Sequence, residues 1–462
     1  MNARGRHPMW RYGLLGLPLA FVALPLYVLL PNHYARSFGV PLASLGALLL
    51  GARLFDALID PLLGRWVDRL FGAGDLANAA QVPLRTGAPR VLRFAFVACA
   101  LLALGFILLF FPPVRGNALL VWAALCLLLT YSAYSAVSVA HQSWGARLGG
   151  DAVQRSRIVA WREGLGLLGV LLAAVLPLLG GLLLSTSVFC LSLALACWAW
   201  AYAQQPSEAL AYAQQNQQAV TQATQPGAQT AAALAHASSA LAAPSARPSA
   251  ALTLPFSRPA FRRLLAVFVL NGIASAIPAT LVLFFVQDRL QAPATSESIF
   301  LALYFAAAAL SMPLWLRAVA RLGLERVWLA GMLLAVGVFA FASQLGAGDS
   351  TAFALVCVLS GAALGGDLLV PGALLTGVIQ RAGDAGHAEG AYLGWWNFAT
   401  KLNLALAAGL ALPLLQAFGY SPGARSAEAL QALMLAYCAL PCTLKLIASY
   451  ALFTHPVEGN LV

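Results

Sequence analysis

Two aspartates, Asp56 and Asp60, lie inside an apolar segment of this chain. Residues four apart share one face of a helix, so the two carboxylates are expected side by side. Acids inside a membrane span are too costly to face lipid and by default mark a site for a proton or a cation. Arg53 lies on the same stripe of the helix, so the alternative is a buried Arg53–Asp56 ion pair that only holds helices together.

The residue after this pair bears on which cation would bind. Pro61 has no N–H, so it leaves the carbonyl oxygen of Ala57 without its helical partner, as an oxygen suited to Na⁺. Two close carboxylates can instead share one proton, because the first charge opposes the second. The pattern therefore leaves Na⁺ and H⁺ equally open as the coupling ion.

A second polar group lies in the apolar segment around residues 130–144. Hydroxyls from threonine, tyrosine and serine are followed by His141 and Gln142. Serines in membrane helices often donate back to the carbonyl four residues earlier, which explains some of the hydroxyls. That alternative does not account for the imidazole and the amide, which favour a polar face toward a water-filled cavity and suggest contacts to a substrate.

Four more charged residues could take part in chemistry. Arg162 and Glu163 open a later apolar segment and are expected as a gate pair, a substrate contact or a simple helix-end pair. Asp367 follows Gly365-Gly366 in mid-segment. Lys401 lies about a dozen residues inside an apolar helix, so it needs an acidic partner or a path to water.

Two other polar residues are given structural roles. Lys445 lies nearer a helix end, so its ammonium is expected to extend to the membrane surface. Asn271 is expected to form an interhelical hydrogen bond. No histidine or cysteine spacing typical of a metal site is present, and no metal beyond Na⁺ is expected.

The composition defines the elements that must position these residues. The chain has 462 residues, of which 61% are hydrophobic and only 9% charged. This composition is typical of a polytopic membrane protein, and the continuous apolar runs predict helices rather than an alternating β-barrel pattern. Hydropathy predicts twelve spans, at about 13–34, 42–67, 91–111, 117–146, 158–184, 186–203, 260–287, 298–317, 327–346, 351–380, 388–418 and 428–453.

The spans divide the chain into two halves. Residues 1–203 and 258–462 each hold six spans, and residues 204–257 are expected to form a disordered cytoplasmic linker rich in Ala, Gln, Ser and Pro. Two six-helix bundles joined by a linker are the layout of a major facilitator transporter, with pseudo-symmetric halves. The short charged segments after the second and eighth spans, Gly64–Arg69 and Leu316–Arg321, also correspond in position.

The net charge of +11 indicates topology rather than nucleic-acid binding. Twenty arginines lie in or near the termini, the linker and the loops on the same side, whereas the opposite side has only Arg36, Arg115, Arg289 and Arg425. Basic residues mark the cytoplasmic side. We therefore expect an integral protein of a bacterial inner membrane, with both termini and the linker in the cytoplasm.

These residues together resemble the glycoside–pentoside–hexuronide:cation symporters of the major facilitator superfamily, of which the melibiose permease is the model. The likeness covers nearly the whole chain except the linker, and its most specific segment is Ala52–Gly64. It implies that Asp56 and Asp60 bind the coupling cation, together with Ser135 and Ser138 of the fourth span. It also implies that Arg162 and Lys401 belong to the substrate site, where we also expect His141, Gln142 and Asp367. Tyr12-Gly13 and Gly419–Pro422 match further motifs of the family.

The chain departs from the family pattern where the sugar binds. Ala20 and Ser138 stand where the family has acids, and Gln142 stands where it has a tryptophan that stacks on the sugar. The acidic motif after the tenth span is reduced to Thr376–Gln380. The cation helix is therefore kept, whereas the galactoside recognition set is largely lost.

The predicted function is secondary active symport of a small solute, driven by Na⁺ or H⁺, with a sugar or glycoside as one candidate. A lysophospholipid or another amphipathic solute is an alternative, because the family has relatives that move such lipids. A sensor or scaffold that transports nothing is a second alternative. The chain has no Walker motif, no G-x-S-x-G and no enzyme signature, so we expect neither an enzyme nor a cofactor, and a monomer that contacts solute and bilayer alone.

Overall fold

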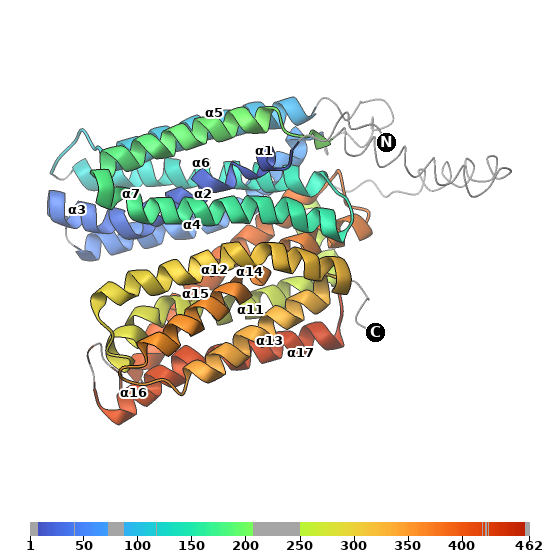
Figure 1. The fold of residues 1–462 in the computed structure, drawn as a ribbon. Coiled ribbons are helices and arrows are strands. Elements are labelled where there is room, and N and C mark those ends of the chain that lie inside the picture. Colours follow the sequence, from blue (N-terminus) through green and yellow to red (C-terminus); the bar gives the residue numbers. More distant parts are fainter. Residues whose placement is uncertain are drawn as a thin grey trace.

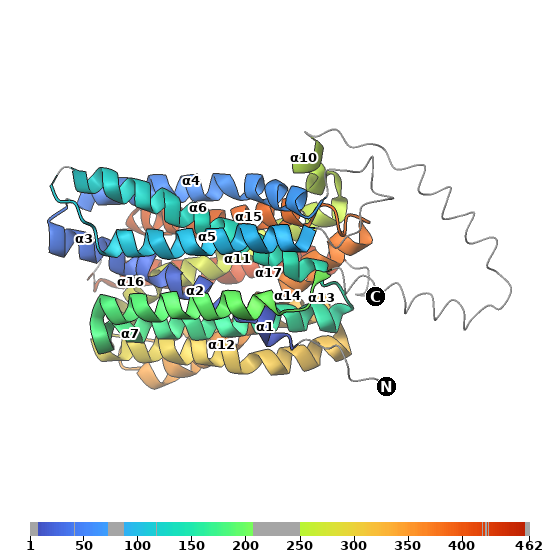
Figure 2. The same ribbon diagram turned by 90° about the horizontal axis from the view of Figure 1, so that it is seen from above.

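The structure is a computed structural model that describes residues 8–40, 42–72, 87–116, 118–206, 250–417, 419–420, 423 and 425–457. All regular elements within these ranges are helical. The helices form two bundles that lie side by side, one from the first half of the chain and one from the second (Figure 1). The first helix begins and the last helix ends at the same end of the molecule (Figures 1 and 2), which we call the terminal end.

The N-terminal bundle contains the six spans expected before the linker. Its elements are α1 (Trp10–Gly13), α2 (Gly16–Leu24), a π-helical turn (Pro25–Leu29), α3 (Leu30–Phe38), α4 (Leu42–Leu70), α5 (Gly87–Phe110), α6 (Ala118–Arg147) and α7 (Ala152–Ala201). The first three pieces and the turn together make the first span. The fifth and sixth spans are both in α7, which reverses direction at Gly180 and Gly181, where Gly181 has a φ of 65°.

The C-terminal bundle repeats this plan. Its elements are α10 (Ala250–Ser257), α11 (Pro259–Phe284), a π-helical turn (Phe285–Arg289), α12 (Ala294–Leu322), α13 (Leu324–Ala342), α14 (Ser350–Arg381), α15 (Glu389–Ala417), α16 (Ala427–Met434), a π-helical turn (Leu435–Ala439) and α17 (Leu440–Thr454). Nine stretches of the described residues are each long and apolar enough to cross a membrane. The first span, α4 and α15 complete the twelve.

The pattern of exposure on α4 shows how a membrane helix separates its two faces. Leu54, Leu58 and Leu62 are exposed and form an outer apolar stripe, with Leu58 67% exposed. Asp56 and Asp60 are 3% and 0% exposed. The costly carboxylates therefore face protein and the leucines face outward, as the cost of a charge in lipid requires.

Two groups of helices join the bundles. α15 packs against α4 and α6, and α7 packs against α12 and α14. Glycines allow the closest approach: a Cβ on Gly64 would lie 2.0 Å from the carbonyl oxygen of Gly390, and a Cβ on Gly394 would lie 2.6 Å from that of Asp60. Small residues at these crossings bring the backbones of α4 and α15 together, so the carboxylates of α4 come within reach of side chains from the other bundle.

One part of the expected linker is ordered. Residues 207–249 lie outside the described residues, but the last eight residues of the expected linker form α10. Trp395 Nε1 donates a hydrogen bond to the carbonyl of Leu252 at 2.8 Å, and its ring lies 4.9 Å from that of Phe256. The linker prediction is wrong for this segment, because its leucines and phenylalanine are apolar enough to pack on α15.

Candidate ion-coupling and solute site

The ammonium of Lys401 lies between the two carboxylates of α4. Lys401 Nζ is 2.8 Å from Asp56 Oδ1 and 2.8 Å from Asp60 Oδ2. It also donates to Ser135 Oγ at 2.8 Å and to the carbonyl of Asp56 at 3.2 Å, and Ser135 Oγ donates to Asp56 Oδ1 at 2.6 Å. Lys401 belongs to α15 and the other three residues to α4 and α6, so the cluster joins the two bundles.

Asp60 is the least satisfied member of this cluster. Its side chain is fully buried, and among the described residues Oδ1 accepts no hydrogen bond. Its Oδ2 is within ion-pair distance of Lys401, but the geometry is not that of a good hydrogen bond. Two carboxylates and one ammonium leave a net negative charge in this cluster, and a buried carboxylate oxygen without a donor is a place where a proton or a cation would be stabilised.

The other residues predicted for the cation site lie near it. Ser138 is one turn further along α6 and buried, but in the described part of the chain it hydrogen-bonds to neither carboxylate. Arg53 is on the same helix and lies beside Tyr131 of α6. Lys401, which we expected at the substrate site, is the direct partner of the acid pair in this structure, and this satisfies its need for an acidic partner.

His141 lies inside the N-terminal bundle. Its ring stacks on that of Tyr12 with centroids 4.2 Å apart, and its Nε2 is 2.8 Å from the carbonyl oxygen of Tyr12. The Tyr12 hydroxyl in turn donates to the carbonyl of His141 at 3.1 Å. The histidine is fully buried and ties the first span to α6. The structure thus gives His141 a packing role. His141 does not line the pocket that lies between the two bundles.

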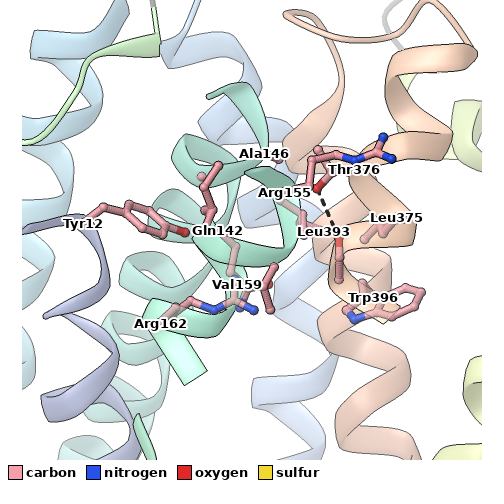
Figure 3. A pocket seen from close by; sticks show the side chains of 13 residues that line it. Tyr12, Gln142, Ala146, Arg155, Val159, Arg162, Leu375, Thr376, Leu393 and Trp396 are labelled. Carbon is pink, nitrogen blue, oxygen red and sulfur yellow. Dashed lines mark hydrogen bonds between the residues drawn. The ribbon is translucent and has the colours of Figure 1, made fainter. Parts of the chain in front are cut away.

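That pocket lies toward the terminal end of the bundle interface and has a volume of about 30 Å³. Tyr12, Gln142 and Arg162 line it from the N-terminal bundle, and Thr376 and Trp396 from the C-terminal bundle (Figure 3). The volume is about that of one water molecule, so the site is nearly closed in this conformation.

Two arginines of the N-terminal bundle, Arg155 and Arg162, line the pocket, and Arg162 has a carboxylate beside it. Arg162 Nε and Nη2 both donate to Glu163 Oε1, at 2.9 and 2.7 Å. Arg162 and Glu163, which are adjacent in the sequence, therefore form a partly exposed ion pair beside the pocket. Gln142 also lines the pocket, as predicted for a substrate contact. The set combines two cations, an amide, hydroxyls and an indole, which suits a polar solute with an apolar face.

Asp367 is placed elsewhere, inside the C-terminal bundle. Its Oδ2 is 2.9 Å from Lys445 Nζ, and its Oδ1 accepts from Asn271 Nδ2 at 3.0 Å and Trp328 Nε1 at 3.1 Å. Lys445 also donates to Asn271 Oδ1 at 2.6 Å. The prediction that Lys445 extends to the membrane surface is wrong: the residue is 3% exposed, because it faces the bundle core where Asp367 provides a counter-ion.

A second cluster across the bundles was missed by the sequence analysis. At the terminal end, Asp68 of α4 pairs with Arg147 of α6 at 2.8 Å, and Arg147 pairs with Glu389 of α15 at 2.9 Å. Asp68 also accepts from the backbone N–H groups of Gly390 and Ala391 at 2.7 and 2.8 Å. Asp68 was visible four residues after Gly64, but its partner Arg147 is 79 residues away along the chain and its partners Gly390 and Ala391 are 322 and 323 residues away. These contacts close the terminal end.

Comparison with known proteins agrees with this architecture. Residues 11–459 match the family described as MFS/sugar transport protein. No curated protein matches the chain. Similar solved structures include a bacterial homologue of the iron transporter ferroportin in an outward-facing state, with 16% identity, a TM-score of 0.64, and coverage of 97% of this chain and 99% of that chain. They also include the proton:xylose symporter XylE, with 13% identity, a TM-score of 0.59, and coverage of 97% and 94%.

The fold and the family match define a major facilitator transporter. The chain belongs to the MFS/sugar transport protein family, which confirms the superfamily expected from the resemblance. It is therefore an integral membrane transporter for a small solute, and not an enzyme. At these low identities the solved structures support the fold alone.

Proposed function

We propose that the chain is a cation-coupled symporter of a small solute, in which Na⁺ or H⁺ binds at Asp56 and Asp60 in exchange for the Lys401 ammonium. The observation that carries this proposal is the position of Lys401 Nζ, 2.8 Å from both carboxylates and supplied by the opposite bundle. The lysine acts as a tethered cation that neutralises part of the site while the bundles are in this arrangement.

The proposed exchange follows from alternating access. Transporters of this fold rock one bundle against the other around a site at the interface. When α15 moves relative to α4, the Lys401 ammonium leaves and two buried carboxylates lose their counter-charge. A free cation that takes its place stabilises the new arrangement, because ligand binding shifts the equilibrium toward the state it prefers. Solute binding between the bundles then depends on whether the cation is bound. This dependence couples solute transport to the cation.

The identity of the cation is left between two candidates. Carboxylate oxygens of Asp56 and Asp60 and the Ser135 hydroxyl supply oxygen ligands of the kind that Na⁺ takes. Asp60 Oδ1, buried and without a donor among the described residues, is equally suited to hold a proton. The acid of the family pattern at Ser138 is absent, so the site has one fewer negative charge, which weakens its attraction for either cation.

We propose a sugar or glycoside as the solute, because the family is described as sugar transport and the pocket between the bundles offers hydrogen-bonding groups beside Trp396. The pocket must widen from about 30 Å³ before any sugar fits. Galactosides are not favoured, since Ala20 and Ser138 replace acids of the family pattern.

Uptake into proteoliposomes tests the coupling. Labelled sugars and glycosides are screened under an imposed Na⁺ gradient, and under a pH gradient with Na⁺ absent. We expect one gradient to drive accumulation, and Asp60→Asn to abolish it. Asp349→Asn is the matched control, because it removes a carboxylate from an exposed turn. If Asp56→Asn and Asp60→Asn both accumulate solute like the parent, the acid pair is structural; if the parent moves no solute under any gradient, the sensor alternative gains.

The orientation is proposed from the arginine distribution: both termini and the linker face the cytoplasm of a bacterial inner membrane. Cysteine labelling at a linker position checks it. A linker cysteine that reacts with an impermeant reagent in intact cells would overturn this orientation.

A further inference from the structure

A cavity of about 210 Å³ lies inside the C-terminal bundle, apart from the pocket between the bundles. Its walls come from the second half of α11, the first halves of α12 and α14, and from α13 and the last span. These segments belong to the half of the bundle that is far from the terminal end. The Asp68 cluster, by contrast, lies at the terminal end and closes the interface there. The proposed coupling mechanism makes no use of this cavity.

The cavity is mostly apolar but has polar groups at defined places. Apolar side chains, among them leucine, valine, phenylalanine and alanine, form most of the wall, and Asp367 and Lys445 contribute the polar floor. Tyr304 and Tyr437 are also part of the lining, and neither hydroxyl has a hydrogen-bond partner among the described residues. Polar groups shielded by protein normally find a partner, so these hydroxyls indicate a place for one that the protein does not supply.

The lysine adds a third unused donor. Lys445 Nζ has three N–H groups and donates to Asn271 Oδ1 and Asp367 Oδ2, which leaves one N–H for another acceptor. Asp367 is already saturated by donors from Asn271, Trp328, Lys445 and Ser275. Within the residues that the structure describes, the floor of the cavity therefore has a free hydrogen-bond donor and no free acceptor. A ligand oxygen could accept from this donor.

The charges favour a neutral ligand. Asp367 and Lys445 neutralise each other, so a charged ligand would add an uncompensated charge to a buried site. Glu297 also lines the outer end of the cavity, in the first turn of α12, and opposes the entry of an anion. The size is above that of an engineered 150 Å³ cavity that binds benzene, so the space suits one aromatic ring with a short side chain.

We propose that this cavity is a binding site for a small neutral amphipathic molecule, a single aromatic ring or short alkyl chain that carries a hydroxyl group. The apolar body lies along the walls. The ligand hydroxyl oxygen accepts from Lys445 and from one of the two tyrosine hydroxyls, and its O–H donates to the other tyrosine. The site does not depend on which solute crosses between the bundles.

The test measures binding of 3-(4-fluorophenyl)propan-1-ol to the purified protein in detergent micelles by ¹⁹F NMR. The matched probe 1-fluoro-4-propylbenzene has the same ring and chain length without the hydroxyl. Protein-free micelles measure the background from partition into detergent. We expect saturable binding of the alcohol to the parent protein, and weaker binding of the alkylbenzene.

Two variants locate the site. Ala279→Phe places a ring in the cavity from an exposed position of its lining, whereas Ala266→Phe adds the same ring on an exposed part of α11 that does not line it. We expect binding to be lost in the first and kept in the second. Parent-like binding to Ala279→Phe, or no signal above empty micelles in the parent, would overturn the proposal.

A double variant tests the polar part without a change of shape. Tyr304→Phe with Tyr437→Phe removes only two hydroxyls, and we expect about tenfold weaker binding of the alcohol with little change for the alkylbenzene. If the alcohol and the alkylbenzene bind the parent equally, or the double variant binds the alcohol like the parent, the hydroxyl is not recognised and the proposed ligand class is wrong. If Ala279→Phe does not fold, the double variant still tests whether the alcohol binds in this cavity.

Discussion

Two buried lysine–aspartate clusters lie in this protein and differ in which helices they join. Lys401 of α15 reaches Asp56 and Asp60 of α4, so that cluster crosses from one bundle to the other. Lys445 of α17 reaches Asp367 of α14, so that cluster stays within one bundle. The same chemical groups are therefore placed once at the interface between the bundles and once inside a single bundle.

The balance of charge differs in the same way. One lysine meets one aspartate in the Lys445 cluster, and Asn271 and Trp328 satisfy the remaining oxygens. One lysine meets two aspartates in the Lys401 cluster, and Asp60 Oδ1 accepts no hydrogen bond among the described residues. A saturated pair holds a bundle together, whereas an unsaturated one across an interface suits exchange with a mobile cation.

The largest expected effect comes from breaking the saturated pair. Asp367→Leu leaves the Lys445 ammonium buried without a counter-charge, so we expect a loss of about 3–5 kcal/mol in the free energy of unfolding. Thermal unfolding of the purified protein measures it. The double variant Asp367→Leu/Lys445→Leu should recover most of the loss. A single variant as stable as the parent would contradict the structural role of this pair.

A smaller effect is expected at the contact that closes the terminal end. Asp68→Asn weakens the bonds to Arg147 and to the Gly390 and Ala391 N–H groups, so we expect the closed arrangement to lose about 1–3 kcal/mol. Spin labels at the end of α4 and the start of α15 should report a longer mean distance. Asp349→Asn, at an exposed turn, is the control, and equal distances in both variants and the parent would count against the closing role.

A further variant tests the close approach of α4 and α15. Gly394→Ala puts a methyl group 2.6 Å from the Asp60 carbonyl oxygen, so the helices must move apart, at a cost of about 1–3 kcal/mol. Gly331→Ala is the control inside the C-terminal bundle, since its Cβ would meet nothing closer than 3.9 Å. We expect solute uptake to fall in the first variant and stay unchanged in the second. Equal uptake would show that the crossing tolerates separation.

The fold was largely predictable because hydropathy and charge report directly on the membrane. Twelve spans in two bundles followed from the length and composition of the apolar runs. The reversal inside α7 at Gly180 and Gly181 is close to the expected boundary between the fifth and sixth spans. The helix α10 was missed, because a short apolar run beside a polar linker gives no sign of the α15 surface that covers it.

The site was predictable in part. The four-residue spacing of Asp56 and Asp60 predicted that they share one face of a helix. The position of Lys401 far inside an apolar helix predicted that it needs an acidic partner. The sequence did not tell which acid, because the partner is in the other half of the chain. Lys445 was misplaced for a related reason: depth along a helix is readable from sequence, but the direction that a side chain faces depends on neighbours that only the packed bundle defines.

The central claim is that Lys401 and the coupling cation compete for the same two carboxylates. Tryptophan fluorescence of the purified protein, in which Trp396 is five residues before Lys401 on α15, can be titrated with Na⁺ at fixed pH and with acid in the absence of Na⁺. Lys401→Met removes a positive charge that lies 2.8 Å from both carboxylates, so we expect the apparent affinity for the coupling cation to rise by at least about tenfold. Lys401→Arg keeps the charge and should not show this rise. An unchanged or lower cation affinity in Lys401→Met would contradict the account.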